Sequence, residues 1–214
     1  MRSYITGAVA AGRAPGAVAL EIVGRIDRTT GRRAGGIVGL TSQQSGYVLN
    51  MRAELSDPGA MANYFTRQRR DKRFDGLVRA AMESGKPVSK ADIDRIAGRY
   101  ADRLLKLRGD TIARTESITA LRAGQHEGYV QLVESGKVRA DQVIRKWSSA
   151  KDIRTRHDHL AMDGTTIRGM FAQFTAPDGS LMDYPGDTSH GASARETINC
   201  RCTCVYSVDR RKMN

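Results

Sequence analysis

Apolar residues recur at helical spacing through the middle of the chain, and the first such segment begins just after residue 40. Thr41 and Gln44 fit a capping box, in which a Thr hydroxyl caps a helix and a Gln three residues later bonds back to it. The predicted helix has one apolar face, made by Tyr47, Val48, Met51 and Leu55. Asp57-Pro-Gly59 is expected to end it.

Residues 60–84 predict a second helix, whose apolar stripe is Phe74, Leu77, Val78, Ala81 and Met82. Gly85 and Pro87 break the pattern, and Ser89 with Asp92 is expected to cap the next helix. Its stripe runs to about Arg108 through Ile93, Ile96, Tyr100, Leu104 and Leu107. Beyond Gly109, Asp110 can cap a further segment with apolar residues at Ile112, Ile118, Leu121, Tyr129, Leu132 and Val133. The pattern allows two helices or one long helix bent at Gly109, in an antiparallel bundle.

After residue 136 the helical period gives way to short alternating segments. One runs from Gln142 to Trp147, and two others flank the turn sequence Ala176-Pro-Asp-Gly179, which predicts a hairpin. Residues 201–208 alternate strictly, with Cys202, Cys204, Tyr206 and Val208 on one face. These segments predict a small antiparallel β domain.

Residues 1–40 are rich in Gly, Ala and Arg, and we expect an extended arm there, with a short strand between Ala17 and Ile26. The predicted fold class is therefore α+β. The expected organisation is an arm over 1–40, a helical bundle over 41–136, a β-rich domain over 137–208 and a frayed tail over 209–214.

The 214 residues carry a formal net charge of +12, and most of the excess lies in the first half. Residues 1–110 hold 20 Lys and Arg against 11 Asp and Glu, whereas the rest hold 15 against 12. Such a surplus favours polyanionic partners, with nucleic acid first and acidic protein surfaces second. The densest basic run supplies the candidate contacts Arg67, Arg69, Arg70, Lys72 and Arg73. A solvated helix end is the alternative for this run.

The chain has no apolar run near the roughly 20 residues of a membrane helix and no signal-peptide pattern at its start. We therefore expect no membrane partner, and synthesis in the cytoplasm. Phosphate-binding loops, dinucleotide fingerprints, His-Glu-x-x-His and nuclease-type carboxylate clusters are also missing from the sequence. Their absence counts against an ATPase or a nuclease.

Chemically reactive side chains are concentrated between Trp147 and Cys204, a stretch that holds the single Trp, all three Cys and three of the four His. Disulfides are disfavoured because cysteines two residues apart on a strand point in parallel. If His157 and His159 lie on a strand, both face one way, and Cys200 and Cys202 on another strand could complete a tetrahedral zinc site. The alternative is buried, apolar cysteines and locally bonded histidines. No other cofactor is expected.

A Cys–His nucleophile is a second interpretation, with His157 or His159 as the base and Asp152 or Asp163 orienting it. Arg154, Arg156 and Arg201 could bind phosphate or an acidic surface, but in a small β domain we expect them to form buried ion pairs with Asp152, Asp163 or Asp187. We expect Trp147 to be a core residue, Asp163-Gly164 to form a turn and Asn199 to lie at the entry to the last strand.

Several short motifs occur together in a fixed order. They are Ala113-Arg-Thr-Glu116, Trp147, Asp152-x-Arg-Thr-Arg-x-x-His159, Asp163-Gly164, Pro185-Gly186 and Ile198-Asn-Cys-Arg-Cys202. In this order and spacing, residues 90–205 resemble the phage Mu F-like head morphogenesis, or minor head protein, family. By position, the residues that match the family motif are Arg154, Arg156, His159, Asn199, Cys200 and Cys202.

The resemblance implies a structural minor capsid protein of a tailed phage or prophage, present in few copies at the portal vertex of the virion. It implies a part in head assembly, DNA packaging or DNA ejection, with the portal protein, other head proteins and packaged DNA as partners. It implies no catalytic activity. Two alternatives stay open: a hydrolase or transferase-type toxin domain using Cys200 or Cys202 with His159, and a zinc-dependent nucleic-acid-binding module.

Overall fold

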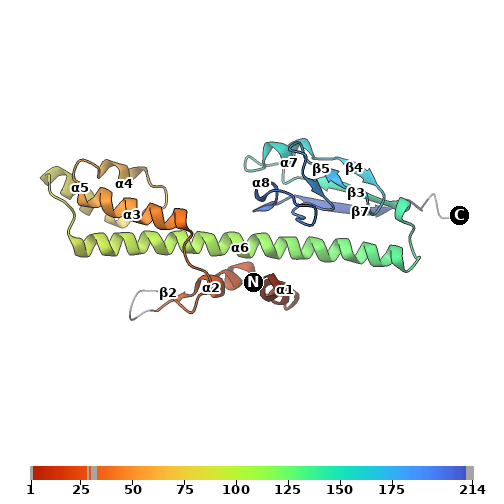
Figure 1. Ribbon diagram of the computed structural model, residues 1–214, viewed down its shortest axis with the longest axis horizontal. Coiled ribbons are helices and arrows are strands. Elements are labelled where there is room, and N and C mark those ends of the chain that lie inside the picture. Colours follow the sequence, from red (N-terminus) through yellow and green to blue (C-terminus); the bar gives the residue numbers. More distant parts are fainter. Residues whose placement is uncertain (1, 28, 30–32, 211–214) are drawn as a thin grey trace. The chain divides into compact units, whose positions relative to one another are not determined.

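The computed structural model describes residues 2–27, 29 and 33–210, and its fold class is α+β, as predicted. The chain forms two compact units (Figure 1). One comprises Met1–Pro15 with Thr111–Asn214, and the other comprises Gly16–Asp110. The division falls inside a helix rather than near residues 40 and 136, where the sequence pattern changes. Among the described residues, no helix is both long and apolar enough to cross a membrane.

The Gly16–Asp110 unit is built on the first half of the helix α6 (Lys90–Glu134), along which α3 (Ser42–Ser56), α4 (Ala62–Thr66) and α5 (Asp75–Ser84) lie in Figure 1. A short 3-10 helix, η1 (Lys72–Phe74), precedes α5. The buried core of the unit combines apolar side chains from all four helices and their loops: Met51, Leu55, Met61, Tyr64, Val78, Val88, Ile93, Ile96, Tyr100 and Leu104. Most of the predicted apolar residues therefore form or line the bundle core, whereas Tyr47 and Met82 are exposed.

Both predicted helix starts are confirmed. The Thr41 hydroxyl accepts from the Gln44 amide N–H at 3.1 Å, and the Gln44 side chain accepts from the Thr41 N–H at 3.1 Å. The Ser89 hydroxyl accepts from the Asp92 N–H at 3.2 Å and donates to its carboxylate at 2.7 Å. These bonds satisfy amide groups that have no partner within the helix itself.

The prediction of one helix over residues 60–84 is wrong, because the chain leaves the helical conformation between α4 and η1. The basic run occupies this irregular segment. Asp71 within it is only 3 % exposed, and its carboxylate accepts from the Arg73 amide N–H, which caps η1. A buried cap that restarts the helix explains the interruption.

Gly109 does not interrupt α6, which is a single helix of 45 residues. The glycine is buried because α2 (Pro15–Val23) passes next to it. A Cβ atom at Gly109 would lie 2.5 Å from Val23 Cγ1 and 3.1 Å from the Ala19 carbonyl oxygen. Gly109 is therefore a point of close helix approach, and the expected cap at Asp110 does not form.

The expectation of an extended N-terminal arm is wrong for the described residues. α1 (Arg2–Ala10) and α2 are helical, and the expected strand at Ala17–Ile26 is reduced to β1 (Arg25–Ile26), paired with β2 (Arg33–Ala34). Pro15 opens α2 at a position where proline suits a helix, and the helix buries Val18, Ala19, Ile22 and Val23 on one face. Residues 1, 28 and 30–32 of the predicted arm lie outside the described residues.

The other unit contains the predicted antiparallel sheet, with strand order β4-β3-β7. Its strands are β3 (Val143–Ser148), β4 (Thr166–Arg168) and β7 (Thr203–Val208), and β4 was not predicted. β5 (Phe174–Thr175) and β6 (Leu181–Met182) form the predicted hairpin. Three short helices complete the domain: η2 (Ala140–Gln142), α7 (His157–Ala161) and α8 (Ala194–Thr197).

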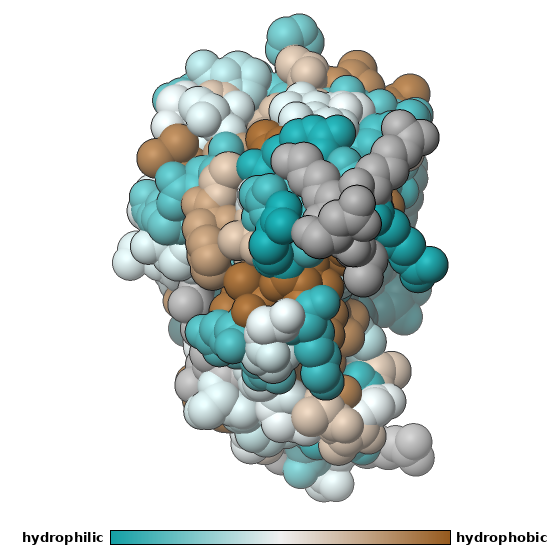
Figure 2. All heavy atoms as spheres, turned by 90° about the vertical axis from the view of Figure 1, so that its right-hand side faces the viewer, coloured by the Kyte–Doolittle hydropathy of each residue, from teal (hydrophilic) through white to brown (hydrophobic). Residues whose placement is uncertain are grey.

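Trp147 is fully buried at the centre of this unit, as predicted, and packs against Phe174 with ring centroids 5.4 Å apart. The other core residues are Met162, Ala176, Met182, Cys200, Cys202 and Cys204. The face of the molecule shown in Figure 2 is mostly polar, with apolar residues gathered near its centre. The expected tail is ordered at its start, because Asp209 bonds to Gln142 and Arg168, whereas residues 211–214 lie outside the described residues.

Replacing Asp71 by Asn is expected to lower the free energy of unfolding by about 1 kcal/mol at neutral pH. The hydrogen bonds from Arg73 hold the pKa of Asp71 at about 2, below its ordinary value of 3.8. The carboxylate therefore stabilises the fold above about pH 4, and this contribution disappears as the pH falls toward 2. Urea denaturation at pH 7 and pH 3 should show a smaller difference between wild type and Asp71→Asn at pH 3. An equal difference at both pH values would contradict this assignment.

Candidate functional site

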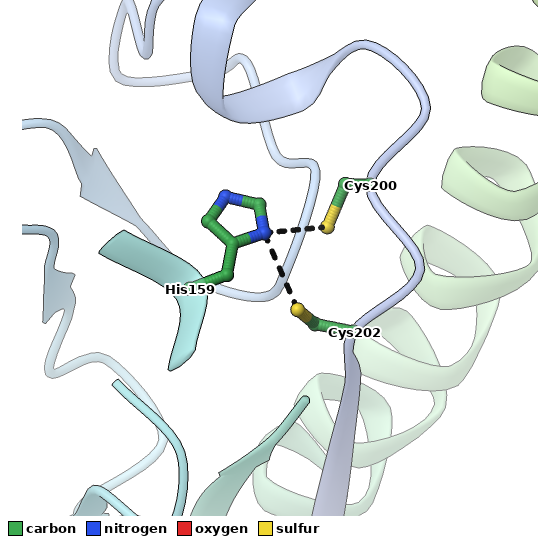
Figure 3. A group of neighbouring side chains, drawn as sticks. All are labelled: His159, Cys200 and Cys202. Atoms are coloured by element: carbon green, nitrogen blue, oxygen red, sulfur yellow. Dashed lines mark hydrogen bonds between the residues drawn. The ribbon is translucent and has the colours of Figure 1, made fainter. Parts of the chain in front are cut away.

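Three of the reactive residues of the second half come together in one buried group in the β-rich unit (Figure 3). The short helix α7 supplies His159, and the segment between α8 and β7 supplies Cys200 and Cys202. All three side chains are buried, with exposures of 2 to 3 %. We call His159, Cys200 and Cys202 the His–Cys–Cys cluster.

One ring nitrogen of His159 faces both sulfur atoms of the cluster. Its Nδ1 lies 3.7 Å from Cys200 Sγ and 3.3 Å from Cys202 Sγ, as drawn in Figure 3. The other ring nitrogen, Nε2, lies 2.9 Å from Oε2 of Glu196 on α8, a side chain that is fully buried. The indole of Trp147 meets the imidazole edge-to-face, with centroids 5.7 Å apart. The orientation of His159 is thus fixed on several sides.

The electrostatic environment distinguishes the three thiols. The hydrogen bond with Cys202 lowers the pKa of Cys200, burial opposes this shift, and the bond with His159 and the charge of Arg122 reinforce it. The pKa of Cys202 is raised by its bond to Cys200 and by burial, and burial raises that of Cys204 to about 11. For His159, burial lowers the pKa, but the bond to Cys200 and the charges of Cys200 and Glu196 outweigh it, so the net shift is upward.

Glu196 and Arg122 were not identified from the sequence, yet both support the cluster. Glu196 takes the orienting role that was predicted for Asp152 or Asp163, and α8, which carries it, has no strong pattern in the sequence. Arg122, on α6, is 7 % exposed and donates to the carbonyl oxygens of Pro185 at 2.9 Å and Cys200 at 3.2 Å. Arg122 thus bonds to both the Pro185-Gly186 motif and the Ile198-Asn-Cys-Arg-Cys202 motif. The residues around it in the sequence did not indicate that it is buried.

Arg145, in the centre of β3, was also missed and is completely buried. Its guanidinium donates to the carbonyl oxygens of Gly169 at 3.0 and 3.2 Å, of Asp183 at 2.8 Å and of Ala172. Alternation along β3 is consistent with an inward-facing side chain at this position. The burial of an arginine could not be predicted from the sequence, because the carbonyl groups that bond to it come from distant segments. Arg145 thereby anchors three loop positions around the sheet.

The remaining motif residues surround the cluster and are largely engaged in local bonds. Asp152 forms an ion pair with Arg201 at 2.6 Å, and Arg156 donates to the carbonyl oxygen of Ile198. Asp163 accepts from the Ser149 amide at 2.8 Å and pairs with Lys151 at 3.0 Å. The other predicted residues lie at three places: Arg154 at the surface with its charge near Asp152, Gly164 in a turn with positive φ, and Asn199 at the entry to the last strand, also with positive φ.

The backbone N–H of Asn199 donates to the Thr115 hydroxyl at 3.0 Å. Thr115 belongs to the motif Ala113-Arg-Thr-Glu116 on α6, so this bond joins two motifs that lie 84 positions apart. Ala113 and Ser117 on the same helix are buried, whereas Leu121, a predicted apolar position, is 62 % exposed. The face of α6 that packs in this unit therefore includes small and polar residues near Arg122, and farther along Tyr129 stacks on Tyr206 with ring centroids 4.5 Å apart.

The four residues predicted as a possible zinc site do not all come together, because His157 lies apart from the other three. His157 and His159 do not lie on a strand but on the helix α7, where residues two apart point in different directions. The His157 side chain is 94 % exposed and lies near Asp158, away from the cluster. His159, Cys200 and Cys202 do come together, with their donor atoms within 4.8 Å of one another.

A small pocket reaches the cluster from the surface. It is lined by Ala150, Arg154, Thr155, Arg156, His159, Asn199, Arg201 and Cys202. Its free volume of about 10 Å³ for the centre of a water molecule corresponds to about one water. His159 and Cys202 are thus accessible to one small ligand beside three arginines, while Cys200 does not line the pocket.

In the basic run, three of the five candidate contacts are held by acidic side chains of their own unit. Arg67 pairs with Glu54, Arg70 with Asp75 at 3.0 Å through two nitrogens, and Arg73 with Asp71 at 2.6 Å. Arg69 and Lys72 are exposed and form no ion pair among the described residues. The positive charge available to a partner is therefore smaller than the sequence indicates.

The fold and the site define an α+β protein with a long helix, a three-stranded antiparallel sheet and a buried His–Cys–Cys cluster. The family described as Phage Mu protein F like protein matches residues 74–205, which contain all the motifs above. The chain belongs to this family, and the predicted resemblance to phage Mu F-like head proteins is confirmed.

Two curated proteins are similar to parts of the chain. The uncharacterized protein YqbB of Bacillus subtilis (strain 168) is 35 % identical over 107 residues, which are 49 % of this chain and 32 % of YqbB. The minor head protein GP7 of Bacillus phage SPP1 is 34 % identical over 89 residues, which are 39 % of this chain and 28 % of GP7. The chain thus covers about a third of either relative's length. No solved structure matches it.

Proposed function

We propose that the protein is a structural minor head protein of a tailed phage or prophage. It resides in the virion at the portal vertex and takes part in head assembly, DNA packaging or DNA ejection. The observation that carries the proposal is the family match over residues 74–205, together with the similarity to a minor head protein of phage SPP1. Its partners in this proposal are the portal protein, other head proteins and packaged DNA.

The structure supports a scaffold role for the motif residues. Asp152 pairs with Arg201, the backbone N–H of Asn199 donates to the Thr115 hydroxyl, and Arg122, which lies outside the quoted motifs, donates to two backbone carbonyls. These bonds hold loops around the sheet. A rigid module of this kind suits a protein that must keep one shape within a symmetric shell.

A non-enzymatic role is part of the proposal. A nucleophilic thiol must be both ionised and accessible. Here both thiols are buried, with exposures of 3 % for Cys200 and 2 % for Cys202, which supports a structural role for the pair.

Contact with DNA or an acidic protein surface is a second part of the proposal, and it rests on fewer residues than the sequence predicted. The exposed Arg69 and Lys72 are available for such a contact, whereas Arg67, Arg70 and Arg73 would first have to leave their carboxylate partners. The net positive charge of the first 110 residues supports the same kind of partner.

Quantitative mass spectrometry of purified, DNA-filled particles from the phage or prophage that encodes the chain tests the proposal. We expect a few copies per particle, comparable to the portal protein and far below the major capsid protein. A copy number that scales with the major capsid protein would contradict a position at one vertex. Absence from particles, with the protein free in the lysate, would overturn the structural role altogether.

A further inference from the structure

The His–Cys–Cys cluster has the donor atoms and the spacing of a metal site. Zinc binds thiolate sulfur at about 2.3 Å and imidazole nitrogen at about 2.0 Å, so tetrahedral geometry separates the two donors by about 3.5 Å. The observed separations of His159 Nδ1 from the two sulfur atoms are 3.3 and 3.7 Å, on either side of that value. Two sulfurs and one imidazole are donors that favour zinc over magnesium or calcium.

Hydrogen bonding alone does not serve all three donor atoms well. A metal-binding His159 must be neutral and carry a single ring proton, and the Glu196 carboxylate oxygen 2.9 Å from Nε2 is placed to accept that proton. Nδ1 is then left with a single lone pair, directed at two sulfur atoms. One lone pair cannot accept well-aligned bonds from both thiols, whereas a single cation among the three atoms would be bound by all of them.

The surroundings of His159 match those of metal-binding histidines. Such histidines commonly donate their second ring N–H to a carboxylate, which fixes the ring and makes the metal-facing nitrogen a better ligand. The fully buried carboxylate of Glu196 occupies that position. The pocket that reaches His159 and Cys202 has room for about one water, which can supply a fourth ligand.

We propose that His159 Nδ1, Cys200 Sγ and Cys202 Sγ bind one zinc ion, with water from the arginine-lined pocket as the fourth ligand. The two thiols bind as thiolates, and their two protons pass to the solvent. Glu196 is a positioning residue that holds the imidazole. The zinc links α7 to the segment before β7 and so fixes the Arg-Thr-Arg-x-x-His and Ile-Asn-Cys-Arg-Cys motifs to each other. This inference does not depend on the role of the protein in the phage head.

Metal analysis of the full chain, purified without chelators, tests the site directly. We expect about one zinc per chain in the wild type and less than about a tenth of that in Cys200→Ser and Cys202→Ser. Cys204→Ser is the matched control, because Cys204 is equally buried on β7 but does not belong to the cluster. This variant should keep its zinc.

Cobalt(II) substitution gives a second readout that does not depend on how the protein was purified. The wild type and Cys204→Ser should show thiolate-to-cobalt absorption and a tetrahedral visible spectrum, and Cys202→Ser should lose both. A folded wild-type chain that contains no zinc and takes up no cobalt would overturn the proposal. Equal zinc content in Cys200→Ser, Cys202→Ser and wild type would show that the metal is held elsewhere, which also overturns it.

Discussion

Replacing Arg145 by Met is expected to destabilise the β-rich unit by about 3–5 kcal/mol, which is a large part of the stability of an ordinary domain. The guanidinium is fully buried and donates to the carbonyl oxygens of Gly169, Ala172 and Asp183. Methionine fills a similar volume but offers no donor. Each buried carbonyl left without a partner costs about 1–3 kcal/mol.

Arg168→Met is the matched control for this change. Arg168 lies on the neighbouring strand β4 and pairs with Asp209 at 3.1 Å, but its side chain is 60 % exposed. Surface ion pairs contribute about 0–1 kcal/mol, so the control should be close to wild type. Trp147, the only tryptophan, is buried in the same unit, and its fluorescence during urea denaturation reports that unit. Equal unfolding midpoints for the two variants would show that the carbonyl network of Arg145 contributes little.

Replacing Gly109 by Leu is expected to destabilise the Gly16–Asp110 unit by about 3 kcal/mol, although leucine favours helices. Even a Cβ atom there would lie 2.5 Å from Val23 Cγ1 and 3.1 Å from the Ala19 carbonyl oxygen. Val23 is β-branched and sits in a helix, so its side chain has little rotational freedom. The larger leucine side chain must therefore push α2 away from α6 and expose the apolar face of α2.

Gly98→Leu, on the same helix, is expected to stabilise the protein, in contrast to Gly109→Leu. No atom lies within 4 Å of a Cβ built at Gly98, and the residue is exposed. Replacing a solvent-exposed helical glycine by leucine stabilises a helix by about 0.5–1 kcal/mol. The midpoint temperature of thermal unfolding, followed by far-UV circular dichroism, should therefore fall for Gly109→Leu and rise for Gly98→Leu. A stabilised Gly109→Leu would mean that α2 does not pack closely at this position.

Local sequence patterns were enough to predict much of the fold. The capping residues Thr41 and Ser89 and the alternation of β7 depend on neighbours within a few positions, and both predictions were confirmed. The apolar stripes of α3 and α5 were confirmed in part, since Tyr47 and Met82 are exposed. The order of the motifs also identified the family, because it requires only residue types at fixed spacings.

The errors arose where a distant segment decides the outcome. Gly109 resembles a helix break when seen alone, and only the passage of α2 beside it explains a glycine inside a continuous helix. The basic run looked like a charged helix, but Glu54, Asp71 and Asp75 neutralise three of its arginines. The charge of a residue can be read from the sequence, whereas its partner depends on how the chain folds.

The sequence by itself determined the α+β class, the family and the presence of His159, Cys200 and Cys202 as a set of reactive residues. Only the tertiary structure decided that His157 stays outside the cluster, that Glu196 orients His159 and that Arg122 and Arg145 are buried. The physical reason is that periodicity fixes which side of its own element a residue faces. The groups that meet it there come from segments up to 84 positions away and are set by packing.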